Sequence, residues 1–154
     1  MDNFDPALIS VVMPCYNAAP YVGEAIGSVL RQTYPRVELI VVDDGSTDGS
    51  NTIVERLAAD NPGRISVLHQ TNSGPYAARN RGLGQARGNF VAFLDADDYW
   101  DADALKKLHD ALADELADIA YCGWQNVGEA AANTQPHIPP DYAAQDAAAL
   151  FLRS

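Results

Sequence analysis

The sequence predicts an α/β fold with a mostly parallel central sheet and helices on both faces. Short runs of branched apolar residues alternate with longer segments in which apolar residues recur at helical spacing. This β-α-β-α order is typical of parallel sheets that are connected by right-handed crossovers. The 154 residues, of which 47% are hydrophobic, are enough for one domain with a sizeable core.

Five segments are expected to be strands because each is short, apolar and rich in branched side chains. We expect Pro14 to end the first strand, residues 8–13, because proline cannot donate to a sheet ladder. Residues 90–94 contain no polar side chain, so we expect a strand buried on both faces. The other three predicted strands are residues 37–42, 65–68 and 119–122.

Helices are expected between these strands. Val22, Ala25, Ile26 and Val29 form one apolar stripe, which predicts a helix over about residues 20–32. The same spacing predicts a helix that ends near residues 61–63, and another over residues 76–85. A further helix is expected to start at residue 101 or 103, and residues 143–152 could form a closing helix.

The composition narrows the classes of partner. The formal net charge of −11 opposes binding to nucleic acid and to anionic membrane surfaces. The sequence has no signal-peptide pattern and no apolar run long enough to span a membrane. Cys15 and Cys122 both lie in apolar segments, so we expect free, buried thiols and a cytoplasmic, reducing compartment.

Three strands are followed directly by distinctive polar or aromatic residues. Because parallel strands end at the same edge of a sheet, these residues should share one rim, where ligands bind in open α/β folds. The crowded carboxylates repel one another, and a divalent cation would relieve that repulsion. The three groups are Tyr16 and Asn17, then Asp43 and Asp44, then Asp95, Asp97 and Asp98.

Such a rim would suit a nucleoside diphosphate, although each residue also has a simpler interpretation. Tyr16 could stack on a base, or it could only pack. Asp44 could accept an N–H or ribose bond, or Asp43 and Asp44 could only shape a loop. Asp98 is expected to start a helix. Arg79, taken alone, would be a solvated helix residue, and the three histidines show no metal-binding spacing.

Five motifs in series resemble those of family-two glycosyltransferases with the GT-A fold, over roughly residues 8–126. Each motif alone is weak, but their order, spacing and content agree together. The motifs are VVMPCYN (residues 11–17), VVDDGSTD (41–48), QTNSG (70–74), ARNRG (78–82) and FLDADD (93–98).

The resemblance implies a Rossmann-like GT-A sandwich that binds a nucleotide sugar, most commonly a UDP-sugar, with Mg²⁺ or Mn²⁺ as cofactor. It further implies inverting transfer to a saccharide or lipid-linked acceptor, in cell-envelope polysaccharide biosynthesis. By the same resemblance, Pro14, Tyr16 and Asp44 hold the nucleoside, and Arg79 supports the donor pocket. Two further carboxylates are assigned this way: Asp95 contacts the ribose, and Asp97 binds the metal.

No residue matches the catalytic base, which similar proteins place well after residue 98. Glu129, Asp141 and Asp146 are not convincing matches. We therefore interpret residues 1–154 as a single GT-A-like domain in which residues 127–154 belong to a truncated acceptor region. The alternative is a donor-binding or nucleotide-binding module on the same fold that does not turn over.

Other α/β classes fit less well. A phosphohydrolase or a receiver domain would need a lysine at a strand end, and neither Lys106 nor Lys107 is placed there. A dinucleotide oxidoreductase would need a glycine-rich turn after the first strand, where residues 14–17 read PCYN instead.

Overall fold

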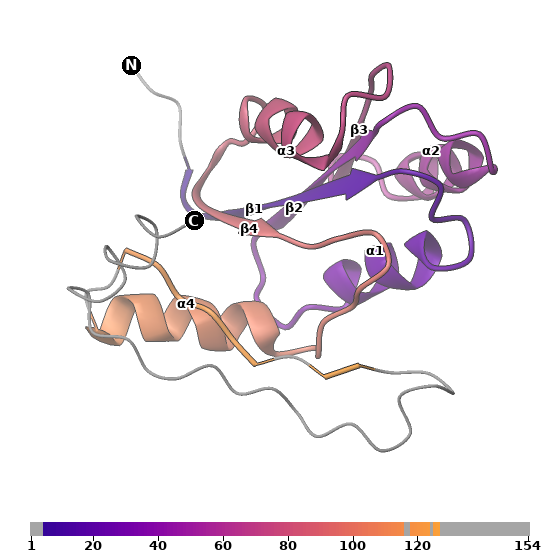
Figure 1. Ribbon diagram of the computed structural model, residues 1–154. Helices are drawn as coiled ribbons and strands as arrows, with labels where there is room; N and C mark the ends of the chain where they lie inside the picture. Colours follow the sequence, from indigo (N-terminus) through magenta and orange to yellow (C-terminus); the bar gives the residue numbers. More distant parts are fainter. Residues whose placement is uncertain (1–4, 116–117, 124, 127–154) are drawn as a thin grey trace. The chain divides into compact units, whose positions relative to one another are not determined.

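The computed structural model describes residues 5–115, 118–123 and 125–126 of the chain. Residues 127–154, with the predicted closing helix over 143–152, lie outside the described residues. The chain divides into two compact units, residues 1–105 and 106–154, and all four strands lie in the first. In chain order (Figure 1) the elements are β1 (Asp5–Cys15), α1 (Val22–Leu30), β2 (Val37–Asp43), α2 (Ser50–Asp60), β3 (Ile65–His69), α3 (Pro75–Leu83), β4 (Gly88–Phe93) and α4 (Ala104–Glu115).

The four strands form one sheet in the order β3-β2-β1-β4, and all three pairings are parallel. Cys15 pairs with Asp43 and Asp43 pairs with His69, so β1, β2 and β3 end side by side at one edge. The predicted parallel α/β sheet is confirmed. Because every strand runs the same way, all the loops that follow the strands open onto the same edge of the sheet.

Helices cover both faces, as the sequence predicts. On one face Val11, Met13 and Leu39 join α1 and Val54 of α2 in the main core. Since strand side chains alternate, the intervening residues point to the other face, where Ile40 and Val42 pack on α3 (Figure 1). The approach of α3 is so close that a Cβ at Gly82 would lie 2.4 Å from Val12 Cγ1.

Pro14 does not end β1, which continues to Cys15. The carbonyl of Val12 accepts from the Leu94 N–H, so residues 12 and 14 direct their backbone groups toward β4. The pairing with β4 stops at Val12 and Phe93. The missing N–H of Pro14 therefore points past the end of that ladder and removes no hydrogen bond from it.

β4 is not buried on both faces. Phe90 and Ala92 pack against the main core, but Val91 is 38% exposed and Phe93 is 47% exposed. Among the described residues β4 is an edge strand, and α3 packs over β1 and β2 instead. The prediction from apolar content alone was wrong because it could not place the strand in the sheet.

The fifth predicted strand does not form among the described residues of segment 119–122. Ile119 is 61% exposed and Tyr121 is 47% exposed. Branched and aromatic residues favour a strand only where a sheet surface buries them, so apolar content alone does not make this segment a strand. Cys15 and Cys122 are both free, as expected, but only Cys15 is buried. Within the described ranges no helix has the length and hydropathy needed to cross a membrane.

Candidate functional site

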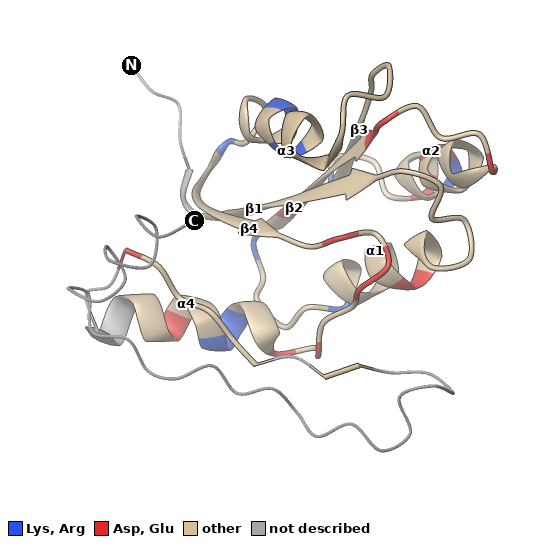
Figure 2. Cartoon of the chain, in the orientation of Figure 1, with Lys and Arg blue, Asp and Glu red and all other residues tan. Residues whose placement is uncertain are grey.

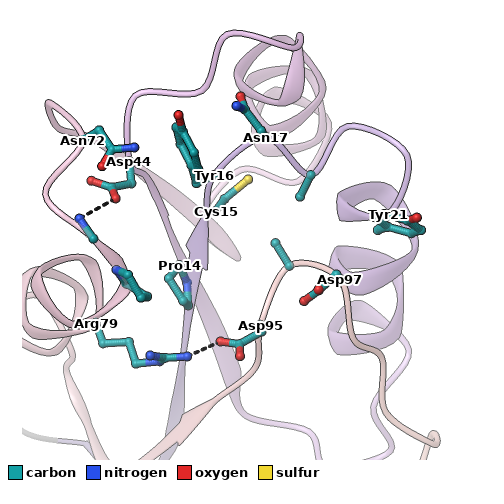
Figure 3. A pocket seen from close by; sticks show the side chains of 14 residues that line it. Pro14, Cys15, Tyr16, Asn17, Tyr21, Asp44, Asn72, Arg79, Asp95 and Asp97 are labelled. Carbon is teal, nitrogen blue, oxygen red and sulfur yellow. Dashed lines mark hydrogen bonds and ion pairs between the residues drawn. The ribbon is translucent and has the colours of Figure 1, made fainter. Parts of the chain in front are cut away.

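A pocket of about 460 Å³ opens at the carboxyl edge of the sheet. All six residues that the sequence predicted for nucleotide-sugar binding line it, from four separate stretches of the chain. Figure 3 shows Tyr16 and Asp44 on one side of Pro14, and Asp95 and Asp97 on the other. The six are Pro14, Tyr16, Asp44, Arg79, Asp95 and Asp97, so the structure brings together every residue of that set.

The loop that carries Tyr16 is fixed by the loop after β2. Asn17 has a positive φ of 49°, and its side-chain oxygen accepts a hydrogen bond from the Thr47 N–H (2.8 Å). Tyr16 is left 52% exposed at the pocket. The backbone N–H groups of three successive residues donate to side chains between β2 and the first residue of α2. These bonds are Asn17 to Ser46 Oγ (3.1 Å), Ala18 to Ser50 Oγ (2.8 Å) and Ala19 to Asp48 Oδ2 (2.9 Å).

Asp44 is almost completely buried and holds the segment that follows β3. Its Oδ1 accepts from Gln70 Nε2 (2.7 Å) and from the Ser73 N–H (2.8 Å), and its Oδ2 accepts from the Gly74 N–H (2.9 Å). Burial alone would raise the pKa of Asp44, but these three hydrogen bonds outweigh it and hold the pKa below its usual 3.8. A carboxylate can accept about four hydrogen bonds, so Oδ2 retains one acceptor position.

Acidic residues follow β4 (Figure 2), and two of them, Asp95 and Asp97, have different surroundings in the pocket (Figure 3). Asp95 forms an ion pair with Arg79, whose Cζ lies 5.9 Å from the centre of the Tyr76 ring. The Asp97 carboxylate is exposed and makes no hydrogen bond or ion pair within the described part of the chain. Arg79 is therefore not a merely solvated helix residue, because its guanidinium orients Asp95 in the pocket.

Negative charge accumulates in this turn. The pKa of Asp98 is raised by its partial burial and then by the charges of Asp97 and Asp95. The prediction that Asp98 starts a helix was wrong. The Asp98 N–H donates to the Asp95 carbonyl (3.1 Å) in a turn, and α4 begins at Ala104. The turn thus brings acidic residues together, and no basic side chain of the described residues pairs with Asp97.

The donor set of this turn fits a divalent cation that is bound partly by its substrate. In the described ranges no three His, Cys, Asp or Glu side chains converge as a complete metal site. Mg²⁺ usually takes one or two protein carboxylates and completes its shell with water and substrate phosphates. A single unpaired carboxylate, Asp97, beside an open pocket is consistent with that mode and not with an all-protein cage.

Several lining residues were not singled out as ligand contacts in the sequence. Tyr21 precedes α1 and is 56% exposed, and Asn72 follows β3 at the same edge. The position of Asn72 after a strand end was a usable signal, whereas nothing in the sequence pointed to Tyr21. Cys15 also lines the pocket, but burial and the nearby Asp43 raise its pKa to about 11, so it remains a thiol.

The fold and the pocket define the class: a parallel α/β protein with an acidic, aromatic-lined ligand site at the carboxyl edge of its sheet. Comparison with known proteins then gives the family. The sequence profile described as Glycosyl transferase family 2 matches residues 10–151. The chain belongs to this family, and the resemblance seen in its motifs is confirmed.

Curated relatives are named as glycosyltransferases. The chain is 37% identical over 133 residues to the uncharacterized glycosyltransferase EpsJ of Bacillus subtilis, covering 86% of this chain and 38% of EpsJ. It is 40% identical over 125 residues to the putative teichuronic acid biosynthesis glycosyltransferase TuaG of the same organism, covering 80% of this chain and 49% of TuaG. The chain thus spans less than half the length of either relative.

Solved structures agree with this assignment. S. aureus TarS 1–349, solved in complex with UDP, matches with a TM-score of 0.63 and 40% identity, over 70% of this chain and 32% of that one. The mannosyltransferase PcManGT from Pyrobaculum calidifontis, solved with GDP-Man and Mn²⁺, matches with a TM-score of 0.65 and 34% identity, over 68% and 32%. The predicted GT-A fold is confirmed.

Proposed function

We propose that this chain forms the donor-binding part of an inverting, metal-dependent glycosyltransferase that moves a sugar from a nucleoside diphosphate to an acceptor hydroxyl. The observation that carries the proposal is the convergence of Pro14, Tyr16, Asp44, Arg79, Asp95 and Asp97 on one pocket. Complexes of the similar proteins with UDP, or with GDP-Man and Mn²⁺, support the same class of ligand.

The nucleoside is assigned to the side of the pocket formed by β1 and β2. The exposed Tyr16 ring offers a flat surface on which a base can stack. The remaining acceptor position of Asp44 Oδ2 can take an N–H of the base, and Pro14 lines the pocket beside them. Uracil is the base we propose, since it carries an imide N–H that such an acceptor binds.

The diphosphate is assigned to the side formed by the turn after β4. Asp95, which pairs with Arg79 and lines the pocket, would accept from a ribose hydroxyl. Asp97 would hold Mg²⁺ or Mn²⁺, which supplies positive charge where the leaving diphosphate becomes more negative. Because Asp97 has no described cationic partner, its carboxylate needs no rearrangement to take this role.

The catalytic base is not assigned to any residue. Inverting transfer requires a carboxylate that removes the acceptor proton on the face of the sugar opposite the leaving group. We propose that residues 127–154 belong to the acceptor-binding part and that the acceptor is a saccharide or a lipid-linked saccharide. A role in cell-envelope polysaccharide synthesis is supported by the teichuronic acid assignment of the relative TuaG.

The competing function is a nucleotide-binding module without turnover. It is favoured by one observation, the absence of a candidate base from the described residues that line the pocket apart from the donor-assigned carboxylates. Both functions require the same donor site, so binding and transfer must be measured separately.

Calorimetry with UDP in the presence of Mg²⁺ or Mn²⁺, and again with a chelator, tests the donor site. We expect saturable binding that weakens when the metal is removed. A screen for transfer or hydrolysis of nucleotide sugars then separates enzyme from module, since turnover supports the transferase and binding alone supports the module. No binding of UDP, GDP or their sugars in the presence of metal would refute both.

A further inference from the structure

His69 is held between two carboxylates on the outer side of the strand ends. Its Nδ1 lies 3.2 Å from Asp43 Oδ2, and its Nε2 lies 2.5 Å from Glu55 Oε1 of α2. Asp43 is nearly buried, whereas His69 and Glu55 are about half exposed. With an acceptor at each nitrogen, the ring satisfies both contacts fully only when both nitrogens carry a proton. A doubly protonated ring donates to both carboxylates and so joins the ends of β2 and β3 to α2.

Asp43 transmits this contact to the loops. Its other carboxylate oxygen accepts from the Ser46 N–H (3.2 Å), and its carbonyl accepts from the Gln70 N–H (2.9 Å). Between these bonds the two loops nearly touch, since a Cβ at Gly45 would lie 3.1 Å from the Asn72 nitrogen. A shift of Asp43 would thus move both loops that follow β2 and β3.

The same two loops form one wall of the pocket. Asp44 follows Asp43 directly, and Gln70 follows His69 directly. Their side chains bond to each other, and Asp44 further holds the backbone of Ser73 and Gly74. His69 itself is not one of the pocket-lining residues. Its influence on a ligand would therefore pass through Asp43 and Gln70.

We propose that His69 is a positioning residue: as an imidazolium between Asp43 and Glu55, it fixes the turn that presents Asp44 to the nucleoside and makes nucleotide affinity depend on pH. This rests on the proposed function, since the wall formed by Asp44 is the part of the pocket assigned to the base. The charged groups that bear on the ring among the described residues are Asp43 on β2 and Glu55 on α2.

The direction of the pH effect follows from the two contacts. Hydrogen bonds that the ring donates to Glu55 and Asp43 raise the pKa of His69 above its ordinary 6.5, against a smaller opposing effect of burial. The ring is thus charged below pH 6.5, and the charge is lost as the pH rises through the raised pKa. Above that pKa one of the two nitrogens loses its proton, and one carboxylate contact is lost with it.

The test is a pH series of UDP binding with Mg²⁺ for the parent and for H69Q, E55Q and H109Q. The parent affinity relative to H69Q should fall at least about fivefold as His69 deprotonates, in the range typical of coupled sites. The ratio to H69Q cancels the titration of UDP itself. Since Glu55 raises the pKa of His69, E55Q should move the step to lower pH. His109 is outside the pocket lining, so H109Q should show the same dependence of UDP affinity on pH as the parent.

The proposal would be overturned if UDP affinity fell with pH by the same factor in H69Q as in the parent. It would also be overturned if the pH of that fall were the same in E55Q as in the parent. E55Q removes an exposed carboxylate, so it remains a usable variant if H69Q does not fold.

A second measurement needs no nucleotide, which separates this proposal from the proposed function. In the free protein, the amide NMR shifts of Ser73 and Gly74 should titrate with the midpoint of the His69 ring. If the amide shifts of Ser73 and Gly74 do not change at the titration midpoint of the His69 ring, the positioning role is refuted even if UDP binds. Amide shifts that follow that midpoint, in a protein that binds no nucleotide, would refute the proposed function and the pH-dependent affinity, and would support only the coupling of His69 to the turn of Ser73 and Gly74.

Discussion

Two carboxylates at opposite edges of the parallel sheet, Glu38 and Asp97, have contrasting surroundings. At the amino edge, Glu38 is buried and fully bonded within the chain. Ser10 Oγ donates to its Oε1 (2.6 Å), and Arg87 donates to both oxygens from its backbone N–H and its guanidinium. At the carboxyl edge, Asp97 is exposed beside a pocket and has no ion-pair or hydrogen-bond partner among the described residues.

The difference separates structural charge from functional charge. Burial alone would raise the pKa of Glu38, but Ser10 and Arg87 lower it below its usual 4.5, so the native state is stabilised by its charge. The turn after β4 shows the reverse, because the pKa of Asp98 is raised by burial and by its acidic neighbours. The charge of Asp97, which has no basic partner among the described residues, is left available for a ligand.

The largest expected effect comes from Asp97→Ala. Metal-dependent UDP binding should be lost, because the only described carboxylate assigned to the cation is removed, while the melting temperature should be unchanged or slightly higher because repulsion falls. Calorimetry with and without Mg²⁺ and a thermal melt measure the two results. Asp60→Ala, an exposed aspartate at the end of α2, is the control and should bind as the parent does. Parent-like metal-dependent binding by Asp97→Ala would show that the metal role is wrongly assigned.

In contrast to Asp97→Ala, Glu38→Gln should lower the stability of the fold and leave UDP affinity unchanged. The loss of charge weakens bonds from Ser10 and Arg87 in a buried position, which should cost about 1–3 kcal/mol of unfolding free energy. Chemical denaturation measures it. Glu24→Gln breaks an exposed pair with Arg31 and should cost less than about 1 kcal/mol. Equal losses in the two variants would contradict the structural role of Glu38.

Tyr16→Ala should weaken UDP binding by about 1–3 kcal/mol if the ring stacks on the base. Tyr99, which is 48% exposed and absent from the pocket lining, provides the matched control as Tyr99→Ala. Competition calorimetry would measure both variants against the parent. If the two variants bind UDP equally well, Tyr16 only packs against the loop.

The smallest expected effect is the pH dependence of the stability that the Glu38 charge contributes at the amino edge of the sheet. Because the pKa of Glu38 is lowered by folding, its stabilisation is fully present above the ordinary value of 4.5 and is lost as the pH falls through the lower folded value. The difference in melting temperature between the parent and Glu38→Gln should therefore shrink below about pH 4.5. A difference that stays constant down to the lowest pH would mean that the Glu38 charge does not contribute.

The sequence predicted the parallel sheet from its apolar runs, and four pocket residues from their place directly after those runs: Tyr16, Asp44, Asp95 and Asp97. Pro14 and Arg79 were assigned only by the resemblance of the motifs to those of the family. The prediction failed where a residue's role depends on its neighbours in the sheet. The exposure of Val91 and Phe93 follows from the edge position of β4, and Pro14 is tolerated because the β4 ladder has already ended. Neither strand order nor ladder length is encoded within a single strand.

The same limit applies within the site. Asp43 and Asp44 are adjacent and identical, so the sequence could not divide their tasks. The structure places Asp44 on the pocket wall and Asp43 against His69. The contacts of His69 with Glu55 and Asp43 bridge 14 and 26 positions, and no spacing rule predicts them. Similarly, Ser46 and Ser50 hold the loop of Tyr16 through contacts that bridge 29 and 32 positions.

The most direct test of the central claim is paramagnetic line broadening by Mn²⁺ in the presence of UDP, followed residue by residue by NMR. The account predicts that broadening centres on the amides of Asp95–Asp98 and reaches Tyr16, while the amides of Glu38 and Arg87 at the amino edge stay sharp. Broadening centred on Glu38, or spread evenly over the acidic surface of the chain, would contradict it.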